Sequence, residues 1–204
     1  SGAGKLLHVD GEGRGLPDHR FCPEESDLDR MCTKVHAKGF RNPFRFTLLP
    51  GGGVVVADVG WNLVEELNLA EAGHDYGWPC REGDGPTPSY SDLPACLDGS
   101  AAHGSQQSGP LYSYGPALGR SILSGPVVDG AAPYPDAYDG RMVYADTVSG
   151  FLNAMRVEQP GVEHLPLAEG LDLPVDLELT PVGEVAYVSF TAGSVRRIRY
   201  APGN

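Results

Sequence analysis

Apolar and polar residues alternate over short stretches near the middle of this chain. Residues 44–48 alternate apolar and polar side chains, residues 54–57 form an apolar run after a glycine turn, and a further segment at 64–69 is again mixed. Period-two alternation is typical of a strand with one buried face, and a short apolar run is typical of a buried strand. The pattern therefore predicts three strands in residues 40–70.

The same plan of strand, turn, strand, turn and strand recurs along the chain. The predicted repeats lie near residues 40–70, 111–158 and 172–200. Repeats of this size with several short strands are typical of propeller blades, so we expect an all-β fold with about three blades in one domain, 1–204. The segments 111–114 and 121–128 are expected to supply the first strands of the second repeat. Residues 71–110, rich in Pro, Gly and Ser and containing two cysteines, are expected to form an insertion.

Composition and charge say more about the possible binding partners than about the fold. The chain has 204 residues with 41% hydrophobic content, 28 glycines and 18 prolines, which fits one packed domain rich in turns. Its formal net charge of −12 argues against nucleic acid or an anionic membrane as a partner, because both attract basic surfaces. A neutral sugar or a cation is compatible. No apolar run approaches the roughly 20 residues of a membrane-spanning helix, and the start at Ser1 has the look of a processed or truncated end.

Four cysteines fall into two local pairs. Cys22 and Cys32 bracket an acidic loop, and Cys80 and Cys96 bracket part of the insertion, so two local disulfides are the simplest pairing. Zinc is the competing interpretation, but the chain has no C-x-x-C pair and no histidine at a matching interval. Disulfides predict a secreted or periplasmic protein, because cysteines oxidise outside the cytosol.

Acidic side chains mark two kinds of position. Glu65 and Glu66 start the third predicted strand beside a loop rich in glycine, and carboxylates with freed main-chain carbonyls suit calcium. Asp58 and Asp146 recur at the same place in two repeats. Because they repeat, a role in stabilising the adjoining turns is expected for them rather than chemistry.

Four motifs give the chain a family resemblance. RNPFRF, ADVGWN, VEELN and DYGWPC resemble, in order and spacing, the soluble quinoprotein glucose and sorbosone dehydrogenase family. The resemblance covers nearly the whole chain and is weakest at 85–110. It implies the C-terminal half of a six-bladed β-propeller that oxidises aldoses with pyrroloquinoline quinone held through calcium. The remaining blades would come from residues missing from this chain or from a second copy. The alternative is a non-catalytic, calcium-stabilised propeller that binds carbohydrate or a protein partner.

The resemblance also implies cofactor contacts. Arg41 and Asn42 match the pair that contacts the quinone and its calcium, and are the candidate catalytic residues. Gly60 and Trp61 match positions whose main-chain carbonyls hold that calcium. An arginine can stabilise a developing negative oxygen, but Arg41 can equally be a buried residue that ties strands together through main-chain carbonyls. Trp61 is also a candidate for stacking on a sugar ring.

A second, structural calcium is implied at Glu65, Glu66 and Tyr76, with Glu65 in place of the family's usual aspartate. Here Glu65 would offer its side chain, whereas Glu66 and Tyr76 would offer main-chain oxygens. Glu82 or Asp84 would add a carboxylate, which gives the several oxygen ligands that calcium takes.

Some family contacts are absent. The lysine and two arginines that grip the cofactor carboxylates match Val148, Leu173 and Val175 here. Arg120 and Arg141 are the candidates to replace them, although both are expected to be surface residues beside turns. The family's general-base histidine lies upstream of the matched segment, so this chain has no matched base and is expected to be inactive by itself.

Overall fold

Strands dominate the computed structural model, which describes residues 2–99, 105–130, 132–161 and 163–201. Within these ranges the helical elements are short: α1 (Met31–Lys34), α2 (Pro94–Leu97) and the 3-10 turn η2 (Asp136–Tyr138). The predicted all-β class is confirmed. None of the described helices has the length and apolar character needed to cross a bilayer.

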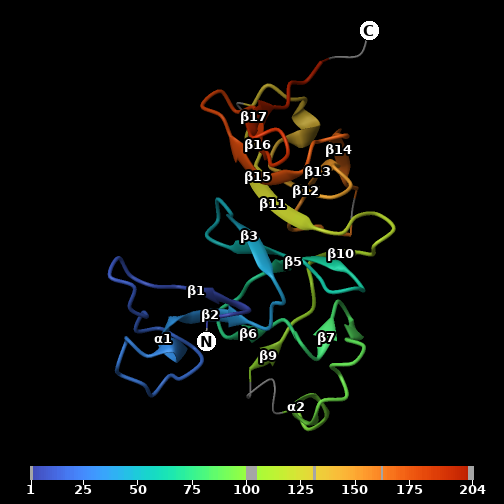
Figure 1. Ribbon diagram of the computed structural model, residues 1–204. Helices are drawn as coiled ribbons and strands as arrows, with labels where there is room; N and C mark the ends of the chain where they lie inside the picture. Colours follow the sequence, from blue (N-terminus) through green and yellow to red (C-terminus); the bar gives the residue numbers. More distant parts are fainter. Residues whose placement is uncertain (1, 100–104, 131, 162, 202–204) are drawn as a thin grey trace.

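Two four-stranded antiparallel sheets follow one another along the molecule, the first near the middle of Figure 1 and the second above it, beside the C-terminal strands. The first has the order β10-β5-β4-β3 and the second the order β11-β12-β13-β14. Their strands are β3 (Pro43–Leu48), β4 (Val54–Asp58), β5 (Glu65–Leu69), β10 (Tyr112–Tyr114), β11 (Ile122–Val127), β12 (Met142–Asp146), β13 (Leu152–Met155) and β14 (Leu165–Ala168). The strands expected within 40–70 are present. The prediction that residues 111–114 open the second repeat is wrong, because β10 pairs with β5, with Ser113 opposite Glu66.

The C-terminal sheet has three antiparallel strands. They are β15 (Pro174–Leu179), β16 (Val185–Ser189) and β17 (Ser194–Arg197). This sheet corresponds to the repeat expected at 172–200. It lies at the opposite end of the molecule from β1 and β2 (Figure 1).

The N-terminal sheet collects strands from distant parts of the chain. Its order is β1-β2-β6-β9, in which β2 pairs with β6, and β6 with β9, in parallel. The strands are β1 (Lys5–Leu7), β2 (Val35–Lys38), β6 (His74–Asp75) and β9 (Gln106–Gln107), and a separate hairpin joins β7 (Arg81–Glu82) to β8 (Gly85–Pro86). The predicted insertion is therefore tied at both ends to the N-terminal sheet.

Close contacts between successive sheets place the core between them. Strand β11 lies next to both β3 and β15, and Thr47 Oγ1 on β3 donates a hydrogen bond of 2.7 Å to the Gly125 carbonyl oxygen on β11. Buried side chains such as Tyr144 and Leu67 fill the space between the first two sheets. Glycine is required at 125, since a Cβ there would lie 2.7 Å from Leu177 Cβ and 2.8 Å from Val143 Cγ2.

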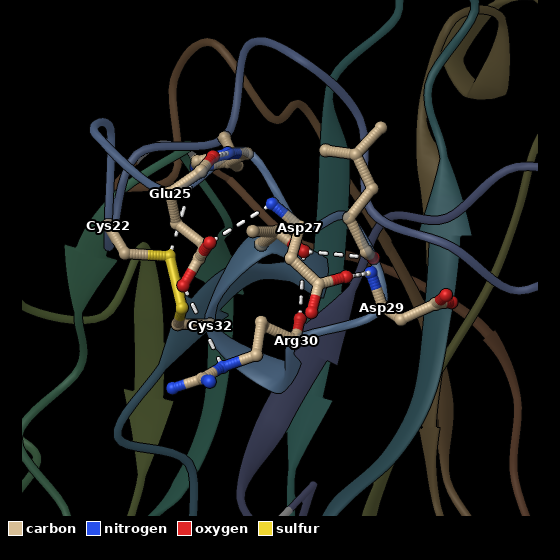
Figure 2. The surroundings of a disulfide bond; sticks show 9 residues. Cys22, Glu25, Asp27, Asp29, Arg30 and Cys32 are labelled. Carbon is tan, nitrogen blue, oxygen red and sulfur yellow. Dashed lines mark hydrogen bonds and ion pairs between the residues drawn. A yellow bond between two sulfur atoms is a disulfide. The ribbon is translucent and has the colours of Figure 1, made fainter.

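Both predicted disulfides are present. Cys22 bonds to Cys32 and Cys80 bonds to Cys96, and no free cysteine remains among the described residues. The zinc interpretation is therefore excluded for these side chains. Around Cys22–Cys32, acidic side chains hold the loop: Asp27 N donates to Glu25 Oε1 at 3.0 Å, and the Arg30 guanidinium lies 3.7 Å from Glu25 Oε2 (Figure 2).

Candidate functional site

The candidate residues meet where β4 ends and the chain turns into β5. Asp58, the last residue of β4, accepts hydrogen bonds from the main-chain N–H groups of Arg41 (2.9 Å) and Asn42 (2.6 Å). Burial raises the pKa of Asp58 to about 7, although these two hydrogen bonds oppose the rise. Asp146 ends β12 and accepts from the N–H groups of Val148 and Ser149 in the turn that follows it. The predicted role in the adjoining turn is confirmed for Asp146, whereas Asp58 binds the segment that precedes β3.

Arg41 ties the turn to β3. Its Nη1 donates to the main-chain oxygens of Val59 (3.0 Å) and Gly60 (2.6 Å), and its guanidinium lies 5.0 Å from the centre of the Trp61 ring. Of the two interpretations of Arg41, the structure therefore shows the tie through main-chain carbonyls. Asn42 takes part through its main-chain N–H to Asp58.

The two carbonyls matched to the cofactor calcium already have partners within the chain. The Gly60 oxygen accepts from Arg41, and the Trp61 oxygen accepts from the Asn62 amide at 2.9 Å when that amide is oriented to satisfy both groups around it. A guanidinium at the Gly60 oxygen would also repel a cation placed there. In this arrangement each of the two oxygens already uses one acceptor position within the chain.

The positions matched to the cofactor's basic contacts carry no charge. Val148 is 60% exposed in the turn after β12, Leu173 precedes β15, and Val175 lies on β15. A quinone with three carboxylates needs positive partners, which these side chains cannot provide. Together with the occupied carbonyls, this means that the described residues do not fit the family's quinone.

Arg120 and Arg141, the candidates to replace the basic cofactor contacts, differ in their exposure to solvent. Arg141 is buried and donates to the main-chain oxygens of Ala137 and Glu163, both at 2.8 Å, so its expected surface location is wrong. Arg120 is exposed as expected. It lines a cavity of about 390 Å³ together with Gly60, Trp61 and Glu65.

Glu65 and Glu66 point to opposite faces of β5, as consecutive residues of a strand do. Glu65 Oε2 accepts from the Ile122 N–H at 3.1 Å and the Gly60 N–H at 3.4 Å. Glu66 accepts from the Gly83 N–H and, at 3.2 Å, from the Asn68 amide. The structure therefore does not bring the two carboxylates to one site.

Glu82 is the central acid of the Glu66 face. Its Oε1 accepts from four successive main-chain N–H groups, those of residues 61–64, at 2.7 to 3.2 Å. Its Oε2 is buried with no hydrogen-bond partner among the described residues, and Asn68 Oδ1 is in the same condition. Burial raises the pKa of Glu66, and the charges of Glu82 and Asp84 raise it further. The Glu66 face thus holds negative charge and unsatisfied oxygens.

Tyr76 contributes packing to this region. Its hydroxyl donates to the Leu69 carbonyl oxygen and accepts from the Glu71 N–H, and its ring stacks on Phe40 at 4.9 Å between centres. Only its main-chain oxygen remains as the ligand that the sequence predicts. Across the described ranges, no three His, Cys, Asp or Glu side chains are close enough to hold a metal ion by themselves.

Comparison with known proteins identifies relatives over most of the chain. A family model described as glucose/sorbosone dehydrogenase matches residues 1–163. A solved glucose dehydrogenase structure is 20% identical with a TM-score of 0.73, and covers 97% of this chain and 55% of its own.

Two further solved structures are similar. The pyrroloquinoline-quinone-bound aldose sugar dehydrogenase of Streptomyces coelicolor is 19% identical with a TM-score of 0.63, covering 98% of this chain and 49% of its own. The apo-form of the soluble aldose sugar dehydrogenase of Escherichia coli is 17% identical with a TM-score of 0.64, covering 98% and 55%. The chain therefore shares their fold and spans about half of their length.

Proposed function

This chain belongs to the glucose/sorbosone dehydrogenase family, and from that membership we propose that it forms part of a domain that acts on aldose sugars and is stabilised by calcium. This chain would contribute a surface that contacts the sugar, at Trp61, and a structural calcium site, at Glu66 and Glu82. The two disulfides suit this role in a secreted or periplasmic protein, since an oxidising compartment preserves them.

The unsatisfied acidic face of β5 carries the calcium proposal. Glu66 and Glu82 are both buried, and Glu82 Oε2 and Asn68 Oδ1 have no hydrogen-bond partner among the described residues. Buried polar atoms without partners are costly, and buried like charges repel, so a cation between them would remove both penalties. Calcium takes carboxylate, amide and main-chain oxygens together, and Tyr76 would add the main-chain oxygen that the family resemblance implies.

Oxidation of the sugar is a proposal for a complete protein and not for this chain alone. The family's reaction needs a quinone that accepts hydride and a base that takes the hydroxyl proton. The described residues do not fit the quinone, and no base matches that of the family. For this chain we therefore favour binding of carbohydrate, the non-catalytic alternative, over turnover.

A thermal unfolding experiment tests the calcium site. We expect millimolar calcium to raise the melting temperature of the wild type, since a ligand of the folded state stabilises it by mass action. Glu66→Gln should lose most of that rise. Glu65→Gln is the matched control, because it makes the same change on the opposite face of β5 and should keep the rise. If calcium leaves the wild type unmoved, or if Glu65→Gln alone abolishes the effect, the proposed site is wrong.

A further inference from the structure

A cavity of about 390 Å³ lies between the turn that follows β4 and the segment that leads into β11. We propose that it binds a monosaccharide that carries one carboxylate, with the sugar ring against Trp61 and the carboxylate held by Arg120. The proposal rests on the sugar-binding function above and specifies the class of sugar.

Trp61 provides a ring that is held in place and still accessible. Its side chain is 49% exposed and lines the cavity. The Asn62 amide accepts from the indole Nε1–H at 2.6 Å, and the guanidinium of Arg41, itself fixed to two main-chain oxygens, lies over the ring. A large aromatic side chain fixed at both its edge and its face loses little entropy when a ligand stacks on it.

Arg120 provides the charge. It is exposed at the cavity wall and forms no hydrogen bond or ion pair with any residue that the structure describes. The guanidinium fork matches a carboxylate with two parallel hydrogen bonds, whereas a neutral sugar hydroxyl offers a weaker partner. An arginine whose donors are unused in a ligand-sized cavity therefore favours an acidic ligand.

Glu65 limits the number of carboxylates. Its side chain also lines the cavity, where it is buried and its Oε2 accepts from the Ile122 N–H at 3.1 Å. A carboxylate there can accept from sugar hydroxyls but repels additional anionic groups. With Arg120 as the one cationic side chain of the cavity lining, a sugar acid with a single carboxylate fits better than a quinone with three.

Titration of one reporter tryptophan tests the proposal. The chain contains two tryptophans, so Trp78→Phe leaves Trp61 as the only indole, and its fluorescence reports a ligand at the ring. Glucuronate, glucose and pyrroloquinoline quinone are titrated separately, with calorimetry as a second measurement of affinity. We expect glucuronate to change Trp61 emission and to bind on the order of ten-fold more tightly than glucose. Arg120→Gln should remove that preference, because it weakens glucuronate binding far more than glucose binding, and its side chain is exposed, so the folded structure should tolerate the change.

Four results would overturn the inference. Equal affinity for glucuronate and glucose, or a preference that survives in Arg120→Gln, would show that Arg120 holds no carboxylate. Tightest binding of the quinone would make the cavity a cofactor site. If none of the three ligands binds while calcium still raises the melting temperature, the inference fails by itself and the calcium proposal stands.

Discussion

Glu82 offers the sharpest test of the proposed calcium site, because its two carboxylate oxygens have different tasks. Oε1 accepts from the N–H groups of residues 61–64, and Oε2 has no partner among the described residues. Glu82→Ala removes both oxygens, whereas Glu82→Gln keeps an acceptor for the N–H groups and removes the charge. The two variants therefore separate the support of the turn from the binding of a cation.

The expected magnitudes follow from this division. Hydrogen bonds to a charged group contribute roughly 1.5–3 kcal/mol and neutral ones about half of that. Residues 61 and 62 are exposed, so water can replace part of what alanine removes, and we expect Glu82→Ala to lower the free energy of unfolding by about 3 kcal/mol in chelator. In Glu82→Gln the hydrogen bonds to the turn become weaker, but the repulsion between Glu82 and Glu66 is removed. The two effects offset each other, so the free energy of unfolding in chelator should change by no more than about 1 kcal/mol.

In the presence of calcium, Glu82→Gln should no longer be nearly as stable as the wild type. At a calcium concentration 100 times the dissociation constant, a bound ion adds about 2.7 kcal/mol to the stability of the wild type. Glu82→Gln should lose most of that increment, so it is destabilised in calcium and almost unchanged in chelator. Urea unfolding of the three proteins under both conditions measures this. An equal loss with and without calcium would show that Glu82 supports the turn alone, and would refute the reasoning.

Three other perturbations probe the fold. Because the folded-state pKa of Asp58 (about 7) lies above its ordinary value of 3.8, the folded state holds an extra proton between these values, so stability without calcium should fall by up to about 4 kcal/mol as pH rises from 4 to 7. Asp58→Asn should flatten this slope in pH-dependent urea unfolding, and an unchanged slope would assign it to other groups. Gly125→Ala should cost about 1–3 kcal/mol in thermal unfolding by overpacking, whereas Gly51→Ala, where a Cβ meets nothing within 4 Å, should cost less; equal effects would contradict the packing argument. Replacing Cys80 and Cys96 by serine should lower stability by about 3 kcal/mol, given the 16-residue separation of the pair, and peptide mapping without reductant checks the pairing in the parent protein.

The sequence predicts the local strands well and their distant partners poorly. Residues 54–58 and 65–69 pair with near neighbours, and their apolar content is visible in a short window. The strand β10 has the same alternation, but its partner β5 lies more than 40 residues earlier, across the insertion. Nothing in the local pattern of β10 distinguishes β5 from the following strand β11, so the assignment to the second repeat followed proximity along the chain.

In the candidate site, too, the features set by local sequence could be predicted and those set by distant contacts could not. The turn role of Asp146 could be predicted because an aspartate repeats at one blade position, but the bonds from Asp58 back to Arg41 and Asn42 could not. The separation of Glu65 from Glu66 could also have been predicted, since side chains alternate along a strand. Glu82 could be predicted only as an additional acid, because its four hydrogen bonds depend on how the insertion folds back onto residues 61–64.

The insertion therefore determines the shape of the candidate site as much as the strands do. Its carboxylate at Glu82 gathers the N–H groups of the turn, and its Tyr90 contacts both Trp61 (6.4 Å) and Trp78 (5.2 Å) between ring centres. The Cys80–Cys96 disulfide closes the loop that carries these contacts. In this turn the Gly60 and Trp61 carbonyl oxygens accept from Arg41 and Asn62, and the cavity lies beside Trp61. The sugar site proposed at Trp61 thus depends on the observed conformation of this turn, in which Glu82 accepts from the N–H groups of residues 61–64.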